Sequence, residues 1–247
     1  MRNLKPVLLK KDDFLLAWAT LLKHCIANES PIIFGGKEEA KRLAAEICSR
    51  VVLEENAVKQ AINGIECAKN PVFPVREMFI QRYIDEYSLE YVDEQRALSK
   101  DSKGRFTYTY YERFRYYPSS NGETIDQIEI LRENVKSQIE SNIFSNRHQI
   151  TTWVPELDLR SSEPPCLQRI WITVVEPGAI EIHIEWRSRD LFGAWHTNLI
   201  AILNMLNRDI AIPNKCKIIR VIDSCDSLHI YAGDLDQAKA AVKYFEI

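Results

Sequence analysis

The spacing of apolar residues near the N-terminus predicts an amphipathic helix. Over residues 12–26, apolar side chains recur at helical spacing behind two aspartates, and Asp12 or Asp13 is expected to cap the first turn. Trp18 and Cys25 fall on the apolar side of this helix, so we expect both of them in the core.

The segments that follow carry helical and extended patterns side by side. Residues 30–37 predict a short strand, whereas the spacing from there to about Val52 fits either a helix or a buried strand. Residues 75–92 are rich in tyrosine and phenylalanine and favour a helix or a mixed segment. The polar run 99–104 predicts a loop.

The rest of the chain alternates between helix and strand patterns. After a turn predicted at 118–122, Thr124 is expected to cap a helix with one apolar face. Because no internal repeat is visible, we expect one mixed α/β domain over residues 1–247. The apolar face consists of Ile128, Leu131, Val135 and Ile139. Strands are predicted near 149–154, 168–175, 179–186 and 217–223, and a long apolar helix near 195–208.

Composition narrows the class of protein. The chain has 247 residues, a formal net charge of −3 and 46% hydrophobic residues, which excludes intrinsic disorder and argues against binding to a nucleic-acid polymer. Its apolar windows are too short for a membrane span. The cysteines show no metal-ligand spacing and no secretory leader is recognisable, so we expect a cytoplasmic protein without a metal site.

Cys166 is the first candidate for chemistry. It follows Pro164 and Pro165, a rigid stretch that can control the rotamer and exposure of the thiol. A nearby guanidinium such as that of Arg187 would favour the thiolate, which is the nucleophilic form. A lone cysteine is more commonly a small buried hydrophobe, so its sequence context must decide between the two interpretations.

That context contains several motifs in a fixed order, each combining residues that can bind or activate a substrate. Downstream of Cys166 stand Arg187-Ser188-Arg189-Asp190, then Asn198 eleven positions after Arg187, then His229-Ile230-Tyr231. Upstream stand the Tyr110–Pro118 segment, Gly122, Asp126-Gln127-Ile128, and Ser145-Asn146-Arg147 followed by Trp153.

In type, order and spacing these motifs resemble the thymidylate synthase family, and most closely its short archaeal-type members. The resemblance covers residues 105–235, whereas residues 1–104 diverge. It implies a single α+β domain with a large mixed β-sheet flanked by helices, the sheet being used for dimerisation. Asn146 departs from the family's paired arginines, and Leu167 stands where a histidine usually follows the cysteine.

The arginine-containing phosphate loop that the family has near its N-terminus is not recognisable. The run 35–37 (Gly-Gly-Lys) is not a nucleotide phosphate loop, because Glu38 stands where serine or threonine is needed. Lys37, Lys41 and Arg42 are the candidate replacements.

The resemblance implies a nucleophilic role for Cys166. Its thiolate would add to carbon 6 of a pyrimidine, so that carbon 5 attacks a one-carbon unit carried by a reduced pterin. Arg187 and Ser188 resemble phosphate ligands, and Arg187 would also help to keep the thiol ionised. Arg147 resembles the arginine that reaches the neighbouring subunit's phosphate site, which implies a homodimer with shared active sites.

Other positions match residues with which the family binds the base, the sugar and the pterin. Asn198 carries an amide that donates and accepts, which suits uracil rather than cytosine. His229 and Tyr231 resemble the pair that binds the sugar 3′-hydroxyl. Asp190 resembles the catalytic carboxylate that contacts the pterin, and Tyr110 would lie near the reacting carbon.

The family also has an acid/base glutamate in an N-terminal helix. The segment 76–80 is the best match and makes Glu77 the first candidate, although it lies closer to Tyr110 than the family norm. Glu86 and Glu90 compete for the role, and an ordinary surface charge is the alternative for all three.

These expectations amount to a thymidylate synthase-type methyltransferase. It would convert dUMP to dTMP with 5,10-methylenetetrahydrofolate or a related reduced pterin. Two alternatives stay open: a pyrimidine nucleotide hydroxymethylase on the same scaffold, and a noncatalytic nucleotide-binding homologue, which Asn146 and the missing loop suggest. The sequence leaves ribose or deoxyribose, and folate or methanopterin, undecided.

Overall fold

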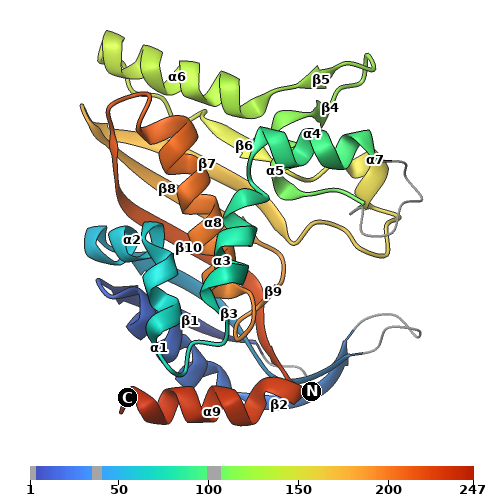
Figure 1. Cartoon of the computed structure of the whole chain (residues 1–247), viewed down its shortest axis with the longest axis vertical. Coiled ribbons are helices and arrows are strands. Elements are labelled where there is room, and N and C mark those ends of the chain that lie inside the picture. Colours follow the sequence, from blue (N-terminus) through green and yellow to red (C-terminus); the bar gives the residue numbers. More distant parts are fainter. Residues whose placement is uncertain (1–3, 35–40, 99–106) are drawn as a thin grey trace.

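A mixed β-sheet forms the centre of the computed structural model, which describes residues 4–34, 41–98 and 107–247 (Figure 1). Within these residues the sheet has eight strands, and parallel and antiparallel pairings alternate along its middle. The main strand order is β1 (Lys5–Lys11), β3 (Lys41–Leu53), β10 (Lys217–Tyr231), β8 (Ala179–Trp186), β7 (Leu167–Glu176) and β6 (Gln149–Thr151). The short strands β2 (Glu29–Phe34) and β9 (Arg189–Asp190) pair with β3 and β10.

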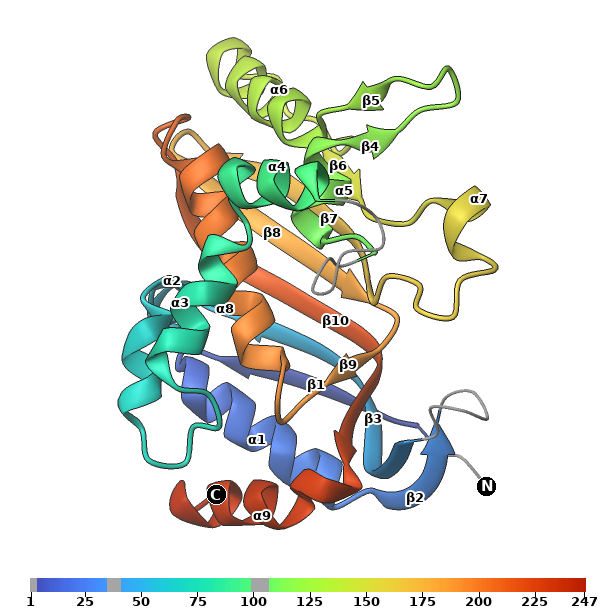
Figure 2. The same cartoon turned by 45° about the vertical axis from the view of Figure 1, so that its right-hand side comes forward.

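Helices gather on one face of this sheet. Along β8 the isoleucines at alternate positions are buried, whereas Glu181, His183 and Glu185 on the other face are partly exposed. The covering layer is centred on α8 (Trp195–Leu206), which is buried along nearly all of its length, with α1 (Phe14–Ile26), α2 (Glu55–Ile62) and α3 (Glu77–Asp85) around it (Figure 2). The alternation of buried and partly exposed residues along β8 matches the period of a sheet with one buried face.

The remaining helices lie around the ends of the sheet. In both views α6 (Gln127–Ser141) and α9 (Leu235–Tyr244) lie at opposite ends of the molecule (Figure 1, Figure 2). The other elements are α4 (Leu89–Ala97), α5 (Tyr110–Arg115), the β4–β5 hairpin (Tyr117–Pro118 and Thr124–Ile125), α7 (Pro155–Asp158), and the short turns η1 (Gly64–Lys69), η2 (Asn207–Ala211) and η3 (Ala232–Asp234).

Several sequence predictions are confirmed. Helix α1 begins where the aspartates predicted, with the Asp13 carboxylate accepting a hydrogen bond from the Leu16 amide at 2.7 Å. Trp18 and Cys25 are fully buried. From Lys41 to Val52, the described part of the segment that fitted either a helix or a buried strand is a strand, and its backbone groups pair on both sides, with β10 on one side.

Two predictions are wrong in their details. Thr124 does not cap α6, because it pairs with Pro118 in the hairpin; the Asp126 carboxylate caps the helix by accepting from the Glu129 amide at 3.0 Å. Strand β10 runs well past residue 223. It continues through a register shift between Cys225 and Leu228, and in the sequence this stretch resembles the end of a strand. The run 35–37, Glu38 and the loop predicted at 99–104 lie outside the described residues.

Candidate active site

Cys166 lies at the start of β7, where the antiparallel pairing with β8 places it beside Arg187. The Arg187 amide donates to the Cys166 carbonyl at 3.0 Å. The thiol is partly buried, and burial raises its pKa; the Arg187 guanidinium, a hydrogen bond with Tyr110 and the more distant Arg189 oppose that rise. A thiol next to a guanidinium was expected from the sequence, but burial outweighs the cation in the free protein.

Arg187 holds the chain that leads into Cys166. Its Nε donates to the Pro165 carbonyl at 2.9 Å and its Nη2 to the Pro164 carbonyl at 2.6 Å. Both acceptors are neutral, so the positive charge of the guanidinium has no carboxylate partner among these bonds. Ser188, the next residue, is buried. The guanidinium can therefore receive an anion at the mouth of the thiol site.

Arg189, two residues further on, has a different environment. It is 3% exposed, its Nη1 donates to both carboxylate oxygens of Asp223 at 2.9 and 3.1 Å, and its guanidinium lies 4.0 Å from the centre of the Trp186 ring. The indole nitrogens of Trp186 and Trp195 each donate to Asp223 at 2.9 Å. This set, which we name the buried ion-pair cluster, is paired and hydrogen-bonded as buried charges must be.

The sequence predictions missed the buried ion-pair cluster. An acidic residue inside a predicted apolar strand, as Asp223 is, was the available signal, since a buried carboxylate needs a cation or several donors. Its partners could not be read from the sequence, because Arg189 and Trp195 come from other elements.

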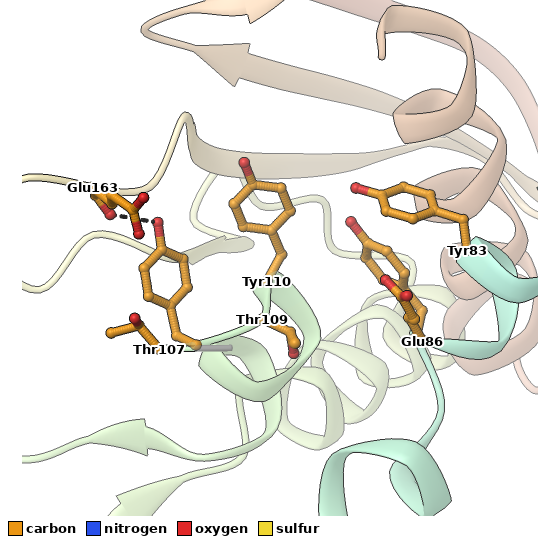
Figure 3. A pocket seen from close by; sticks show the side chains of 8 residues that line it. Tyr83, Glu86, Thr107, Thr109, Tyr110 and Glu163 are labelled. Carbon is orange, nitrogen blue, oxygen red and sulfur yellow. Dashed lines mark hydrogen bonds between the residues drawn. The ribbon is translucent and has the colours of Figure 1, made fainter. Parts of the chain in front are cut away.

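A pocket of about 290 Å³ lies beside the thiol site, and four of the eight residues that line it are tyrosines. Tyr110 from α5 and Tyr83 from α3 direct their rings toward the same space, and the Tyr108 hydroxyl donates to the Glu163 carbonyl at 3.0 Å (Figure 3). Thr109 positions Tyr110 by capping α5, since its hydroxyl accepts from the Glu112 amide at 3.0 Å. The Tyr110 ring also meets the Trp186 ring edge-on at 5.9 Å.

Asn198, in the first turn of α8, forms a hydrogen bond with one tyrosine of this pocket. Its Nδ2 donates to the Tyr83 hydroxyl at 2.7 Å. Burial raises the pKa of Tyr83 to about 12, helped by the Glu86 charge, so the phenol stays protonated at neutral pH. The side-chain amide of Asn198 thus connects α3 and α8, two helices that are distant in sequence.

Asp190 closes the turn that leads from β9 to α8. Its Oδ1 accepts from the amides of Phe192 and Gly193, each at 3.0 Å. A Cβ atom at Gly193 would lie 2.5 Å from Asp190 Oδ2, so any larger residue there would displace the Asp190 carboxylate. The carboxylate is therefore held by the backbone while remaining partly exposed.

The pairing of β10 with β9 brings His229 and Tyr231 close to Asp190. Leu228 and His229 pair with Arg189 and Asp190, and the Leu191 amide donates to the His229 carbonyl at 2.7 Å. The His229 and Tyr231 rings meet edge-on at 4.9 Å. Burial raises the pKa of Tyr231, and the charges of Asp190 and Cys166 raise it further, which shows that these groups share one neighbourhood.

The three candidate glutamates differ in their exposure and in whether they line the pocket. Glu77 is exposed in the first turn of α3 and is absent from the tyrosine-lined pocket, and Glu90 is exposed in the first turn of α4. Glu86, directly after α3, is partly buried and lines that pocket. Burial raises the pKa of Glu86, and Arg82, whose Nε lies 3.6 Å from its carboxylate, partly opposes the rise.

Arg147 is not brought to Cys166 within one chain. It is exposed in the loop after α6, in a separate hollow with Phe144, Asn146 and Trp171. Trp171 stands five residues along β7 from Cys166, which corresponds to about 16 Å of strand.

Two kinds of feature are absent from the described part of the chain. No group of three or more histidine, cysteine, aspartate or glutamate side chains among these residues is arranged to hold a metal ion. No helix formed by them is both long and apolar enough to cross a bilayer.

Comparisons with known proteins agree with the motifs. The family model described as "Thymidylate synthase" matches residues 63–244. A protein of Methanothermobacter marburgensis named "Putative thymidylate synthase" is 29% identical over 237 residues, which cover 94% of this chain and 96% of that protein. A protein of the same name from Methanosarcina mazei is 25% identical over 203 residues, or 78% of this chain and 84% of its own length.

Proposed function

This chain belongs to the thymidylate synthase family, and from that premise we propose that it is a methyltransferase that converts dUMP to dTMP. The proposed one-carbon donor is 5,10-methylenetetrahydrofolate or a related reduced pterin, and the proposed location is the cytoplasm. The observation that carries the proposal is the partly buried Cys166 thiol, hydrogen-bonded to Tyr110 and facing Arg187.

Cys166 is the proposed nucleophile. Its thiolate sulfur forms a bond to carbon 6 of the uracil ring, and the electron pair of the 5,6 double bond moves toward O4. Arg187 and Tyr110 favour the thiolate against the cost of burial. Asn198 stabilises the charge on O4 by donating a hydrogen bond, which leaves carbon 5 nucleophilic.

The nucleotide contacts follow the positions around Cys166. Arg187 and Ser188 would bind the phosphate, since among the described residues the Arg187 guanidinium bonds two neutral carbonyls and can exchange them for a dianion. His229 and Tyr231 would bind the sugar hydroxyl. The His229 Nδ1 lies 3.2 Å from the Ser227 carbonyl, and this contact favours the Nδ1–H tautomer.

The tyrosine-lined pocket is the proposed pterin site. Its rings, from Tyr83, Tyr108 and Tyr110, offer flat apolar faces of the kind that a heteroaromatic ring requires. Asp190, held by the turn amides, would accept from the pterin's ring nitrogens. When bound, the pterin supplies the methylene carbon and the hydride that reduces it.

We assign the acid/base role to Glu86 in preference to Glu77. Glu86 lines the pocket next to Tyr83 and has a pKa raised by burial, which moves it toward the operating pH of a general acid or base. Glu86→Gln is expected to lower kcat by about 100-fold, within the range for removing a general base, while Glu77→Gln retains the wild-type rate. The reverse result would return the role to Glu77.

A homodimer would supply Arg147 to the partner's phosphate site. The sheet face opposite the helices carries Trp171 against His183 at 4.7 Å, and Arg220 paired with Glu181 at 2.6 Å, and could pack against a second copy. Mixing inactive Cys166→Ala with inactive Arg147→Ala chains should restore about a quarter of the wild-type activity, because half of the mixed dimers' sites regain both residues. Absence of any recovery would place Arg147 outside the partner's site.

The first test is release of tritium from carbon 5 of labelled dUMP, with and without methylenetetrahydrofolate. The wild type is compared with Cys166→Ala and with Cys216→Ala, which removes a buried thiol outside the site as a control. The proposal expects pterin-dependent release and a methyl product from the wild type and the control only. A hydroxymethyl product would establish the hydroxymethylase instead, and binding of dUMP without release would establish a noncatalytic homologue.

A further inference from the structure

Trp186 ends strand β8 and lies between the buried ion-pair cluster and the thiol site. Its backbone pairs with Leu167, the residue directly after Cys166. Its side chain is buried, and its Nε1–H donates to Asp223 Oδ1 at 2.9 Å. The Arg189 guanidinium lies 4.0 Å from the centre of its ring. A hydrogen bond at the ring edge and a cation over the ring therefore hold the indole in one place.

The indole of Trp186 packs against the ring of Tyr110. The two rings meet edge-on, with their centres 5.9 Å apart and an angle of 76° between their planes. This arrangement sets the positive edge of one ring against the negative face of the other. The other aromatic ring that contacts Tyr110 among the described residues is Tyr108, which belongs to the same segment of the chain. Trp186 is therefore the aromatic contact by which the sheet holds the Tyr110 ring.

The hydroxyl of Tyr110 reaches the chain at Cys166. It accepts from the Leu167 amide and bonds the Cys166 thiol. Because an amide N–H can only donate, the hydrogen of the hydroxyl is available to the sulfur. Burial raises the pKa of Tyr110, so the phenol carries this hydrogen at neutral pH. Tyr110 therefore donates to the thiolate, the form of Cys166 that burial disfavours.

Several charged or titratable side chains surround the Cys166 sulfur. Two guanidinium groups and the Tyr110 hydroxyl favour its thiolate, against the effect of burial. Both cations have bonds that do not involve Trp186, since Arg187 bonds two carbonyls and Arg189 bonds Asp223. Among the described residues, the surrounding groups are Arg187, Arg189, Tyr108, Tyr110 and Tyr231.

We propose that Trp186 is a positioning residue of the thiol site: anchored on Asp223, it holds the Tyr110 ring so that the hydroxyl meets the Cys166 sulfur. Without the indole, Tyr110 can adopt rotamers in which its hydroxyl misses the sulfur. The catalytic consequence rests on the proposed function, because it assumes that Cys166 is the nucleophile. The arrangement itself concerns the free protein and is tested on the thiol alone.

The test measures the pH dependence of Cys166 alkylation by iodoacetamide, followed by mass spectrometry of the Cys166 peptide. The midpoint of the profile reports the thiol pKa, and the plateau at high pH reports access to the sulfur. Trp186→Phe removes the indole N–H and the larger part of the ring contact. Trp195→Phe is the matched control, because its indole also donates to Asp223 at 2.9 Å while its ring stacks on Phe14.

The expected effects form a double-mutant cycle. Tyr110→Phe should slow alkylation at pH 8 about tenfold and move the midpoint to higher pH, because the thiolate loses a charge-assisted hydrogen bond. Trp186→Phe should slow it at least about threefold in the same way, and Trp195→Phe by less than about 1.5-fold. The double variant of Trp186→Phe and Tyr110→Phe should match Tyr110→Phe alone, because the route through the hydroxyl is already lost.

A second readout uses the wild type. In NMR spectra of protein labelled with ¹³Cζ-tyrosine, the Tyr110 signal is identified by its loss in Tyr110→Phe. It should shift with pH at the midpoint of the Cys166 alkylation profile, because the hydroxyl senses the charge on the sulfur. The Tyr110 ring protons should also show a nuclear Overhauser effect with the Trp186 indole. Both observations are available even where Trp186→Phe does not fold.

The outcomes separate this inference from the function beneath it. An unchanged midpoint in Trp186→Phe, or an equal shift in Trp195→Phe, overturns the role of Trp186. A further shift in the double variant means that Trp186 acts through Arg189, which also overturns it. In the wild type, a Tyr110 signal without the coupling to Cys166 or without the indole contact overturns the arrangement. Where every result is as expected but dUMP releases no tritium, the proposed function fails and the positioning of the thiol stands.

Discussion

Arg187 and Arg189 are separated by one residue, yet they belong to two different layers of the site. Arg187 bonds the neutral carbonyls of Pro164 and Pro165 at the partly exposed mouth of the site. Arg189 is 3% exposed and bonds the fully buried Asp223. The first guanidinium can exchange its partners for a ligand anion, whereas the second is committed to a carboxylate and two indole rings.

The role of each guanidinium depends on the groups that already neutralise its charge. Removing the partner of a buried charge leaves an uncompensated ion, and the protein loses stability. Removing a cation whose partners are neutral carbonyls leaves nothing charged behind, and the protein loses affinity for anions. Four changes to the protein or its conditions should distinguish these roles, from the largest expected effect to the smallest.

Asp223→Ala should give the largest effect. It leaves Arg189 and the indole N–H groups of Trp186 and Trp195 buried without their acceptor, which costs about 3–5 kcal/mol of unfolding free energy. Urea denaturation followed by circular dichroism measures the loss. Ser224→Ala, at the next position of β10, is the control and should change stability by less than about 0.5 kcal/mol. Equal losses in the two variants would remove the distinction between the layers.

Arg187→Met should leave the fold nearly unchanged and weaken nucleotide binding. Loss of a charge-assisted contact to the phosphate costs about 1.5–3 kcal/mol, or roughly 10- to 150-fold in the Kd of dUMP. Deoxyuridine, which lacks the phosphate, should bind both proteins alike in the same calorimetric titration. A parallel loss of deoxyuridine binding would show that Arg187 supports the site's shape rather than the anion.

Acidification should lower the unfolding free energy of the protein through His196. This imidazole is fully buried, and burial, with the Arg189 charge adding to it, lowers its pKa from 6.5 to about 3. Between these values the unfolded chain binds a proton that the native protein does not, so the unfolding free energy falls as pH drops below 6.5, by up to about 1.4 kcal/mol per pH unit. Urea titrations at pH 7.5, 6.5 and 5.5 measure the slope.

The control for this pH effect is His196→Phe. It removes the titrating ring but keeps an aromatic side chain beside Phe73 and Trp18. The difference in slope between the wild type and this variant isolates the contribution of His196. Identical slopes would mean that His196 is as accessible to protons in the native protein as in the unfolded chain.

The smallest effect concerns the reactivity of Cys166. Because burial raises its thiol pKa, alkylation by iodoacetamide should accelerate with pH beyond the range of an ordinary cysteine. Arg187→Met should raise that pKa further and slow alkylation several-fold at pH 8, since the thiolate fraction falls, whereas Arg187→Lys restores most of the rate. An unchanged profile in Arg187→Met would mean that Arg189 supplies the relevant charge. Mass spectrometry of the Cys166 peptide gives the rate.

Local signals in the sequence specify several elements of the fold. The cap at Asp13, the buried face of α6 and the alternation along β8 depend on residues within a few positions of one another, and each appears in the structure. The ordered motifs around Cys166 were sufficient to indicate the family. In the structure, strand pairing brings these motifs together: Arg187 returns opposite Cys166, and β9 places Asp190 next to His229.

Tertiary structure alone decided the rest. Glu77 matched the local pattern, yet it lies in the exposed first turn of α3, and of the three candidate glutamates it is Glu86 that lines the pocket. The bond between Tyr83 and Asn198 spans 115 positions, and that between Arg189 and Asp223 spans 34. Burial and the choice of a distant partner set the charge state and orientation of a polar side chain, and neither is encoded in the spacing of its neighbours.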